Sequence, residues 1–191
     1  TFPSLFALMA RRHMHQYGTT REQLSAVAVK AHDNACRNPY AQFHKRITLE
    51  DVGRSAMVAD PLTLYDCSPI SDGAAALVVT TRERAADLRG KPVRLLGFGQ
   101  ASDSLSLFRR QDMTSLAAAR EAARRAYTMA RLSPHDVSFA EVHDCFTIAE
   151  IIASEDLGFF ERGQAGPATL AGQTGLCGSI PLNPSGGLKG L

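Results

Sequence analysis

The second half of the chain alternates short apolar runs with segments of helical periodicity, and this order constrains the fold more than any other feature. The apolar runs span 74–80, 93–100 and 137–142, and the helical segments span 81–89, 114–132 and 146–157. The first run, AAALVVT, has no polar alternation, as expected for a strand that is buried on both faces. Strand, helix, strand and helix in succession predict a parallel or mixed sheet, so the expected fold class is α/β.

The first half is predicted to be mainly helical. A helix is expected over 2–17, with Gly18 as its stop signal. The spacing of Thr19 and Glu22 predicts a capping box for a second helix, which Asn38-Pro39 ends. Residues 40–72 are predicted to be mostly loop, with a short helix near 48–56. The composition shifts near Gly90–Pro92, and this divides the chain into regions 1–92 and 93–191.

Charge and cysteine content exclude several classes of protein. The formal net charge is only +2 and no long basic run occurs, so no nucleic-acid partner and no membrane surface are predicted. The uncharged run at 1–10 is too short to span a bilayer. Four cysteines without a CxxC pair predict reduced thiols in a cytoplasmic compartment and no zinc site. His13 and His15 stand two apart on a predicted helix, so we expect surface histidines and no metal site.

The stretch EVHDCFTIAE (141–150) carries the strongest candidates for chemistry. A strand ending at Val142 delivers His143, Asp144 and Cys145 to the start of a helix, where open α/β sheets bind ligands. Free N–H groups at a helix start stabilise an anion, which predicts a lowered pKa for Cys145. His143 is predicted to donate to a developing oxyanion. The alternative is that Asp144 is only the N-cap of the helix and Cys145 a small buried apolar residue.

The stretch PLNPSGGLKG (181–190) is the second candidate. Paired glycines let a backbone approach a ligand closely, and successive N–H groups form an anion-binding nest. The same residues are also typical of a plain tight turn, so the stretch alone does not decide between the two interpretations.

Together, these two stretches resemble the thiolase superfamily, specifically the sterol-carrier-protein-type thiolases and related acetyl-CoA acetyltransferases. The segments CSPISDGAAALVV (67–79) and ARLSPHDVSFAEVHDCF (130–146) are similar to the same family. The resemblance implies a thiolase-like fold, a layered α/β/α arrangement with mixed sheets, incomplete in this chain. Residues 1–92 would then form the loop domain and the closing strand of the first thiolase half. Residues 93–191 would form the first part of the C-terminal half.

The resemblance also implies roles for single residues. His143 would hold the enolate oxygen of an acyl-CoA through a water, and Cys145 would be an acid/base. Phe146 would line the pantetheine tunnel. The substrate-binding set would also include the supporting loop and two residues facing the pocket, which are Asn183, Gly186, Gly187, Phe6 and Met9.

The family's nucleophilic cysteine would lie upstream of Thr1, and its Gly-His-Pro and Cys-x-Gly motifs after Leu191. We therefore expect a piece of an acyl-CoA C-acyltransferase that is inactive alone. The full protein would be a cytoplasmic enzyme, or a peroxisomal or mitochondrial one in a eukaryote. It would form a homodimer or tetramer, with a partner protein in a thiolase complex as a further option, and would use a coenzyme A thioester as substrate without a separate cofactor. The alternatives are a non-catalytic acyl-CoA-binding scaffold subunit and a thiolase-fold retro-aldol lyase.

Overall fold

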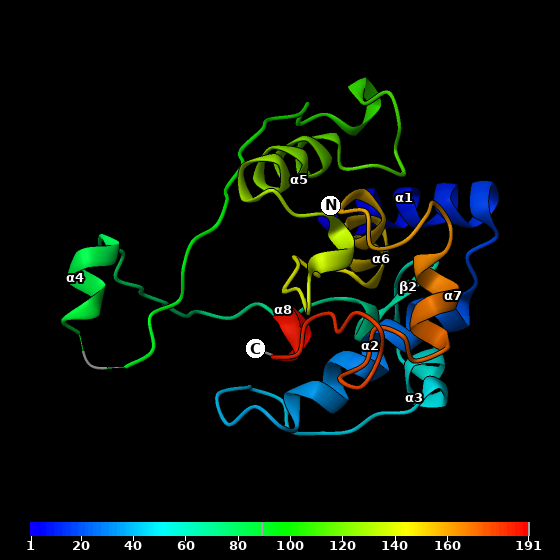
Figure 1. Cartoon of the computed structure of the whole chain (residues 1–191). Helices are drawn as coiled ribbons and strands as arrows, with labels where there is room; N and C mark the ends of the chain where they lie inside the picture. The colour runs from blue at the N-terminus through cyan, green and yellow to red at the C-terminus, as the bar shows by residue number, and fades with distance from the viewer. Residues whose placement is uncertain (89, 191) are drawn as a thin grey trace.

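The computed structural model describes residues 1–88 and 90–190, and helices form most of its regular structure (Figure 1). The helices and strands in chain order are α1 (Phe2–Tyr17), α2 (Arg21–Ala35), α3 (Leu49–Arg54), β1 (Met57–Ala59), β2 (Leu62–Thr63), α4 (Arg82–Ala86), α5 (Ala117–Ala130), α6 (Thr147–Asp156), α7 (Ala165–Leu170) and α8 (Gly187–Gly190). Three short 3₁₀ turns are η1 (Leu64–Asp66), η2 (Leu107–Arg109) and η3 (Pro134–Asp136).

The first two helices lie where the sequence predicts them. Helix α1 ends at Gly18, which adopts the left-handed conformation at φ 74°. Helix α2 starts one residue later than expected, because its capping box is formed by Thr20 and Gln23. The predicted pair of Thr19 and Glu22 is therefore wrong by one position. Thr19 is free for a different contact, described below.

Helix α6 is the centre of the core. All ten of its residues are buried, as expected for a helix that is covered on every side. Ile148, Ile151 and Ile152 pack against buried side chains of α1 and α2, among them Met9 and Leu24. Each fully buried isoleucine contributes roughly 1.5–3 kcal/mol relative to exposure. The helix that follows the HDCF stretch is thus fixed in place by packing.

The three predicted strands do not form regular strands. Within the described residues, the only sheet is the antiparallel hairpin of β1 and β2, in a region predicted as loop and short helix. The predicted strand 137–142 contributes a single parallel bridge, between Ala140 and Leu182. A strand exists only through hydrogen bonds to neighbours, and the described residues place no strand beside 74–80 or 93–100.

Residues 70–96 leave the body of the molecule as a long arm that carries α4 (Figure 1). Nearly every described side chain of the arm is exposed, including Leu77, Val78 and Val79 at 81, 92 and 74%. The prediction that 74–80 is buried on both faces is therefore wrong for this structure. Helix α4 lies inside the predicted helix 81–89, of which residue 89 is outside the described residues.

The chain returns to the body alongside α5. A Cβ on Gly97 would stand 2.3 Å from the Ala126 carbonyl oxygen, and one on Gly99 would stand 2.0 Å from that of Ala122. The backbone at both glycines therefore lies against α5 at a distance that no side chain would allow. Apolar residues that recur at helical spacing in α5, among them Ala119, Ala123 and Tyr127, are half-buried. Within the described residues, no helix is both long enough and apolar enough to cross a membrane.

Candidate active site

The two motifs singled out in the sequence lie side by side. The Val142 N–H donates to Asn183 Oδ1 at 2.7 Å, and the Asn183 N–H donates to the Ala140 carbonyl at 2.8 Å. The Glu141 carboxylate accepts both the N–H and the hydroxyl of Ser185, each at 2.9 Å. The end of the 137–142 segment is thereby joined to the turn at 183–187, although about forty residues separate them in sequence.

Asn183 is the residue that fixes the turn. Its side chain is fully buried, and its Nδ2 donates to Glu150 Oε2 at 2.9 Å. Its carbonyl accepts from Asn34 Nδ2 on α2 at 2.9 Å. The backbone has a φ of 50°, a left-handed conformation that asparagine tolerates better than most residues. Asn183 therefore holds the turn at 183–187 in place. Its support of a catalytic loop and its contact with a substrate remain predictions.

Gly186 and Gly187 permit the turn to approach the protein itself. They have φ values of 103° and 60°, which disfavour any side chain. A Cβ on Gly186 would lie 2.8 Å from the Ala35 Cβ, and one on Gly187 would lie 2.4 Å from Asp144 Oδ2. The close approach expected of these glycines is thus made to α2 and to the HDCF stretch. Their role toward a ligand remains a prediction.

The structure places His143, Cys145 and Phe146 at the start of α6 with different exposures. His143 is exposed, Cys145 is half-buried and Phe146 is 7% exposed. The Phe146 ring stacks on that of Phe6 in α1, with centroids 4.6 Å apart. Met9 is 3% exposed and belongs to the core cluster. Phe6 and Phe146, both predicted to face the pocket, therefore contact each other, and Met9 packs in the core.

The predicted lowering of the Cys145 pKa is wrong for this structure. Burial raises the pKa of the Cys145 thiol to about 11, and the neighbouring Asp144 charge acts in the same direction. The positive charge of Lys189 and the Phe146 N–H at the helix start oppose the rise without cancelling it. At neutral pH the side chain is a thiol, which can donate a proton.

Asp144 is not the N-cap of α6, so this part of the alternative interpretation is also wrong. The N-cap is Phe146, whose side chain cannot accept a hydrogen bond. Asp144 is fully buried, and its Oδ1 accepts the Leu188 N–H at 2.7 Å. Its Oδ2 has no hydrogen-bond partner among the described residues. Burial raises the pKa of this carboxyl group, and the charge of Lys189 partly offsets the rise.

Buried and half-buried charged residues lie next to the site. Lys30 of α2 pairs with Glu150 of α6 and also donates to the Leu182 carbonyl at 3.0 Å. Arg21 donates to both carboxylate oxygens of Asp66. Lys189 is 2% exposed and donates to the Asp66 carbonyl at 2.5 Å. Burial lowers the pKa of Lys189, and the charges of Asp144 and Asp66 oppose this shift.

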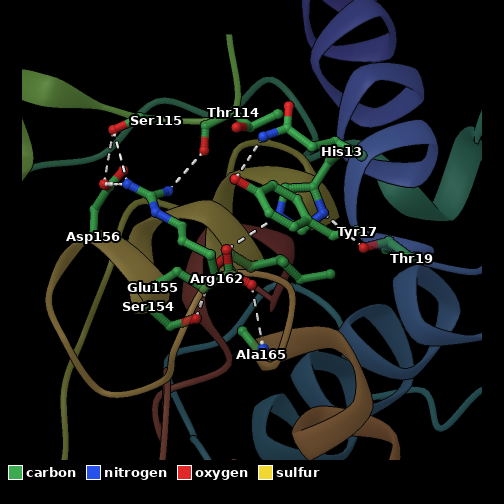
Figure 2. Close-up of polar contacts among 12 residues, drawn as sticks. His13, Tyr17, Thr19, Thr114, Ser115, Ser154, Glu155, Asp156, Arg162 and Ala165 are labelled. Carbon is green, nitrogen blue, oxygen red and sulfur yellow. Dashed lines mark hydrogen bonds and ion pairs between the residues drawn. The ribbon is translucent and has the colours of Figure 1, made fainter. Parts of the chain in front are cut away.

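A second polar cluster fixes the other end of α6, and Figure 2 shows its members. His13 Nδ1 lies 2.6 Å from Thr19 Oγ1, and His13 Nε2 lies 3.1 Å from Glu155 Oε2. Glu155 also accepts the Ala165 N–H of α7 at 3.2 Å. His13 is fully buried, so the expectation of a surface position is wrong for it and correct for His15. These contacts join α1, α6 and α7.

Comparisons with known proteins agree with this arrangement. Residues 3–83 match the thiolase N-terminal domain, and residues 99–190 match the thiolase C-terminal domain-like family. The chain belongs to the thiolase superfamily. The acetyl-CoA acetyltransferase of Methanothermobacter thermautotrophicus is 54% identical over 99% of this chain and 49% of its own length. Sterol carrier protein 2 of Bos taurus is 36% identical over 97% of this chain and 35% of its own length.

A solved structure titled "Ltp2-ChsH2(DUF35) aldolase" matches this thiolase-superfamily chain with a TM-score of 0.92 at 36% identity. The match covers 97% of this chain and 50% of that one. The predicted thiolase-like α/β fold is therefore confirmed, although the described residues pair few of its strands. The chain spans about half the length of the archaeal acetyl-CoA acetyltransferase and of the solved chain, and about a third of sterol carrier protein 2.

Sequence reasoning missed the buried charges of this thiolase-superfamily chain. Lys30 and Glu150 are 120 positions apart, and Lys189 and Asp66 are 123 apart, so no local motif links them. One signal was available. Glu150 is flanked by apolar residues at 148–149 and 151–153 in the helix that directly follows the HDCF stretch, and a charge there requires a buried partner.

Proposed function

We propose that this chain supplies the enolate-stabilising part of an acyl-CoA C-acyltransferase, an enzyme that makes or cleaves 3-oxoacyl-CoA. The supporting observation is the placement of His143 and Cys145 at the start of α6, beside the turn that Asn183 fixes. The high identity to a protein named acetyl-CoA acetyltransferase supports the same class.

The chemistry requires a hydrogen-bond donor at the enolate oxygen and a proton carrier at the carbon next to the thioester. Condensation removes a proton from the carbon next to a thioester, and the enolate oxygen that forms needs a preorganised donor. The exposed His143 imidazole is available for this role, directly or through a water. In the thiolysis direction the neutral Cys145 thiol gives its proton to the enolate carbon and becomes a thiolate. Burial favours the protonated thiol, which is the form that this step requires.

A covalent acyl-cysteine divides such a transfer into two steps. None of the four cysteines stands in the sequence context of the family's nucleophile, so we propose that this cysteine lies outside the 191 residues. The chain alone is then expected to bind or complete a site without turnover.

The experiment compares the full-length protein with its His143→Ala variant in thiolysis of acetoacetyl-CoA and in condensation of acetyl-CoA. Loss of one oxyanion donor is expected to lower the condensation rate by about 10²–10³. Acylation of the nucleophilic cysteine, followed by mass spectrometry, should survive because that step uses a different oxyanion site. His135→Ala, at another exposed histidine, is the matched control. Condensation at the wild-type rate by folded His143→Ala protein would refute the assignment.

The solved structure titled an aldolase favours a second candidate, a retro-aldol lyase of acyl-CoA that works with a partner protein. We rank it below the transferase because such lyases usually carry tyrosine-based sites, whereas this chain has HDCF. Cleavage of a β-hydroxyacyl-CoA without any acyl-cysteine would favour the lyase. Binding of acyl-CoA without either reaction would favour a scaffold subunit.

A further inference from the structure

Asp144 is the one member of the HDCF stretch whose side chain reaches across to the neighbouring turn. Its buried Oδ1 accepts the Leu188 N–H at 2.7 Å. The carboxylate lies against Gly187, where any Cβ would stand 2.4 Å from Oδ2. The glycine and the carboxylate therefore fit each other, and neither has room to move toward the other.

The carboxylate is buried although one of its oxygens is unpaired. Oδ2 has no partner among the described residues, and such groups are rare in folded proteins because their desolvation is not compensated. The positive charge of the buried Lys189 acts on Asp144 and partly offsets the cost. The hydrogen bond from the Leu188 N–H to the other oxygen also offsets this cost, and it ties the Asp144 side chain to the start of α8.

Asp144 stands between His143 and Cys145 in sequence, so its position determines theirs. On the far side of Asp144, the Cys145 carbonyl accepts the Ser68 N–H at 2.9 Å. Hydrogen bonds from Leu188 and Ser68 thus hold this segment from two directions. Loss of the first contact would release the backbone next to the exposed imidazole of His143.

We propose that Asp144 is a positioning residue, whose hydrogen bond to Leu188 holds His143 and Cys145 in the places where they act. The proposal rests on the proposed function of those two residues. Asp144 itself is not expected to touch substrate.

The test uses Asp144→Asn and Asp144→Ala in the full-length protein, with Asp72→Asn at an exposed position as control. Asparagine retains an oxygen that accepts the Leu188 N–H, whereas alanine does not. We expect Asp144→Ala to lower kcat by about 10- to 100-fold, because small misplacement of reacting groups has effects of this size. KM should change less than about twofold, since uniform binding of substrate is not affected. Asp144→Asn should recover most of kcat.

A second readout does not depend on activity. Both variants lose the negative charge beside Cys145, so a difference between them in the rate of Cys145 alkylation by iodoacetamide does not come from that charge. We expect several-fold faster alkylation in Asp144→Ala than in Asp144→Asn. This measurement tests the positioning even if the wild-type protein transfers no acyl group, an outcome that would refute the proposed function by itself.

Three results would overturn the proposal. They are wild-type kcat in folded Asp144→Ala protein, equal losses in the alanine and asparagine variants, and equal alkylation rates in both. If Asp144→Ala does not fold, Gly187→Ala disturbs the same contact from the other side by placing a methyl group against Oδ2. Unchanged kcat in folded Gly187→Ala protein would also overturn it.

Discussion

Two opposing effects act on the Cys145 thiol at the residue scale, and burial is the stronger. The start of a helix stabilises a thiolate, but the effect is modest and falls off within the first turn. Loss of hydration disfavours the thiolate, and the adjacent Asp144 adds a like charge. The sequence motif indicates that Cys145 lies at a helix start but does not show that its thiol is buried. For this reason the predicted direction of the pKa shift was wrong.

This shift has a consequence for stability. The folded protein has a Cys145 pKa of about 11, above that of the unfolded chain, so it favours the neutral thiol. The stabilising contribution is complete below about pH 9 and is lost as the pH rises toward about 11. Urea midpoints of the 191-residue chain should therefore fall across this window, and they should fall less steeply in Cys145→Ala. Equal slopes in the two proteins would contradict the raised pKa, because every other titrating group is common to both.

The residues that sequence could identify are those whose meaning is local. The pattern His143-Asp144-Cys145 and the turn beginning at Asn183 are recognisable as stretches of chain. What Asp144 and Lys189 do depends on burial and on partners far away in sequence, so the structure was needed to assign it. The missed function of Asp144 was hidden by a correct general rule, because aspartate before a helix is usually an N-cap.

At the scale of elements, helices could be predicted and strands could not. A helix satisfies its hydrogen bonds within one segment, so periodicity and stop signals such as Gly18 are sufficient. A strand depends on neighbours that no local pattern names. The run at 74–80 has strand composition, yet no described residue pairs with it. The packing of α1 on α6 likewise depends on contacts between distant residues, of which His13 with Glu155 is the clearest.

The contact between His13 and Glu155 is predicted to stabilise the packing of α1 on α6. His13→Ala leaves the buried Glu155 and Thr19 without one partner each, and an unsatisfied buried group costs about 1–3 kcal/mol. His15→Ala, at the exposed histidine on the same helix, should change the unfolding free energy by less than about 0.5 kcal/mol. Denaturant unfolding of both variants measures the difference. Equal stability of the two would show that the His13 contacts contribute nothing net.

At the scale of the whole molecule, the body and the arm differ in how they bury apolar side chains. The body buries an apolar core around α6, whereas the arm at 70–96 exposes valine and leucine side chains that a soluble monomer normally covers. The resemblance to a thiolase half explains the composition of the arm, because those side chains are typical of a strand within a sheet. The apolar side chains of the arm are therefore suited to packing contacts that the described residues do not make.

The exposed arm leads to a prediction about association. Over 74–80 the side chains are exposed and the backbone pairs with no strand of the described residues, so this run forms an uncovered edge, and such edges pair with other chains. We expect the isolated 191-residue chain to self-associate with rising concentration, as light scattering would measure. Val78→Lys places a charge in the middle of the run and should reduce association without loss of the helical signal, since Val78 is 92% exposed and outside the core. Arg84→Lys, in α4 of the same arm, preserves the charge and should leave association unchanged. A cooperatively folded wild-type monomer at all concentrations would contradict the argument, because it would mean that the arm finds cover within its own chain.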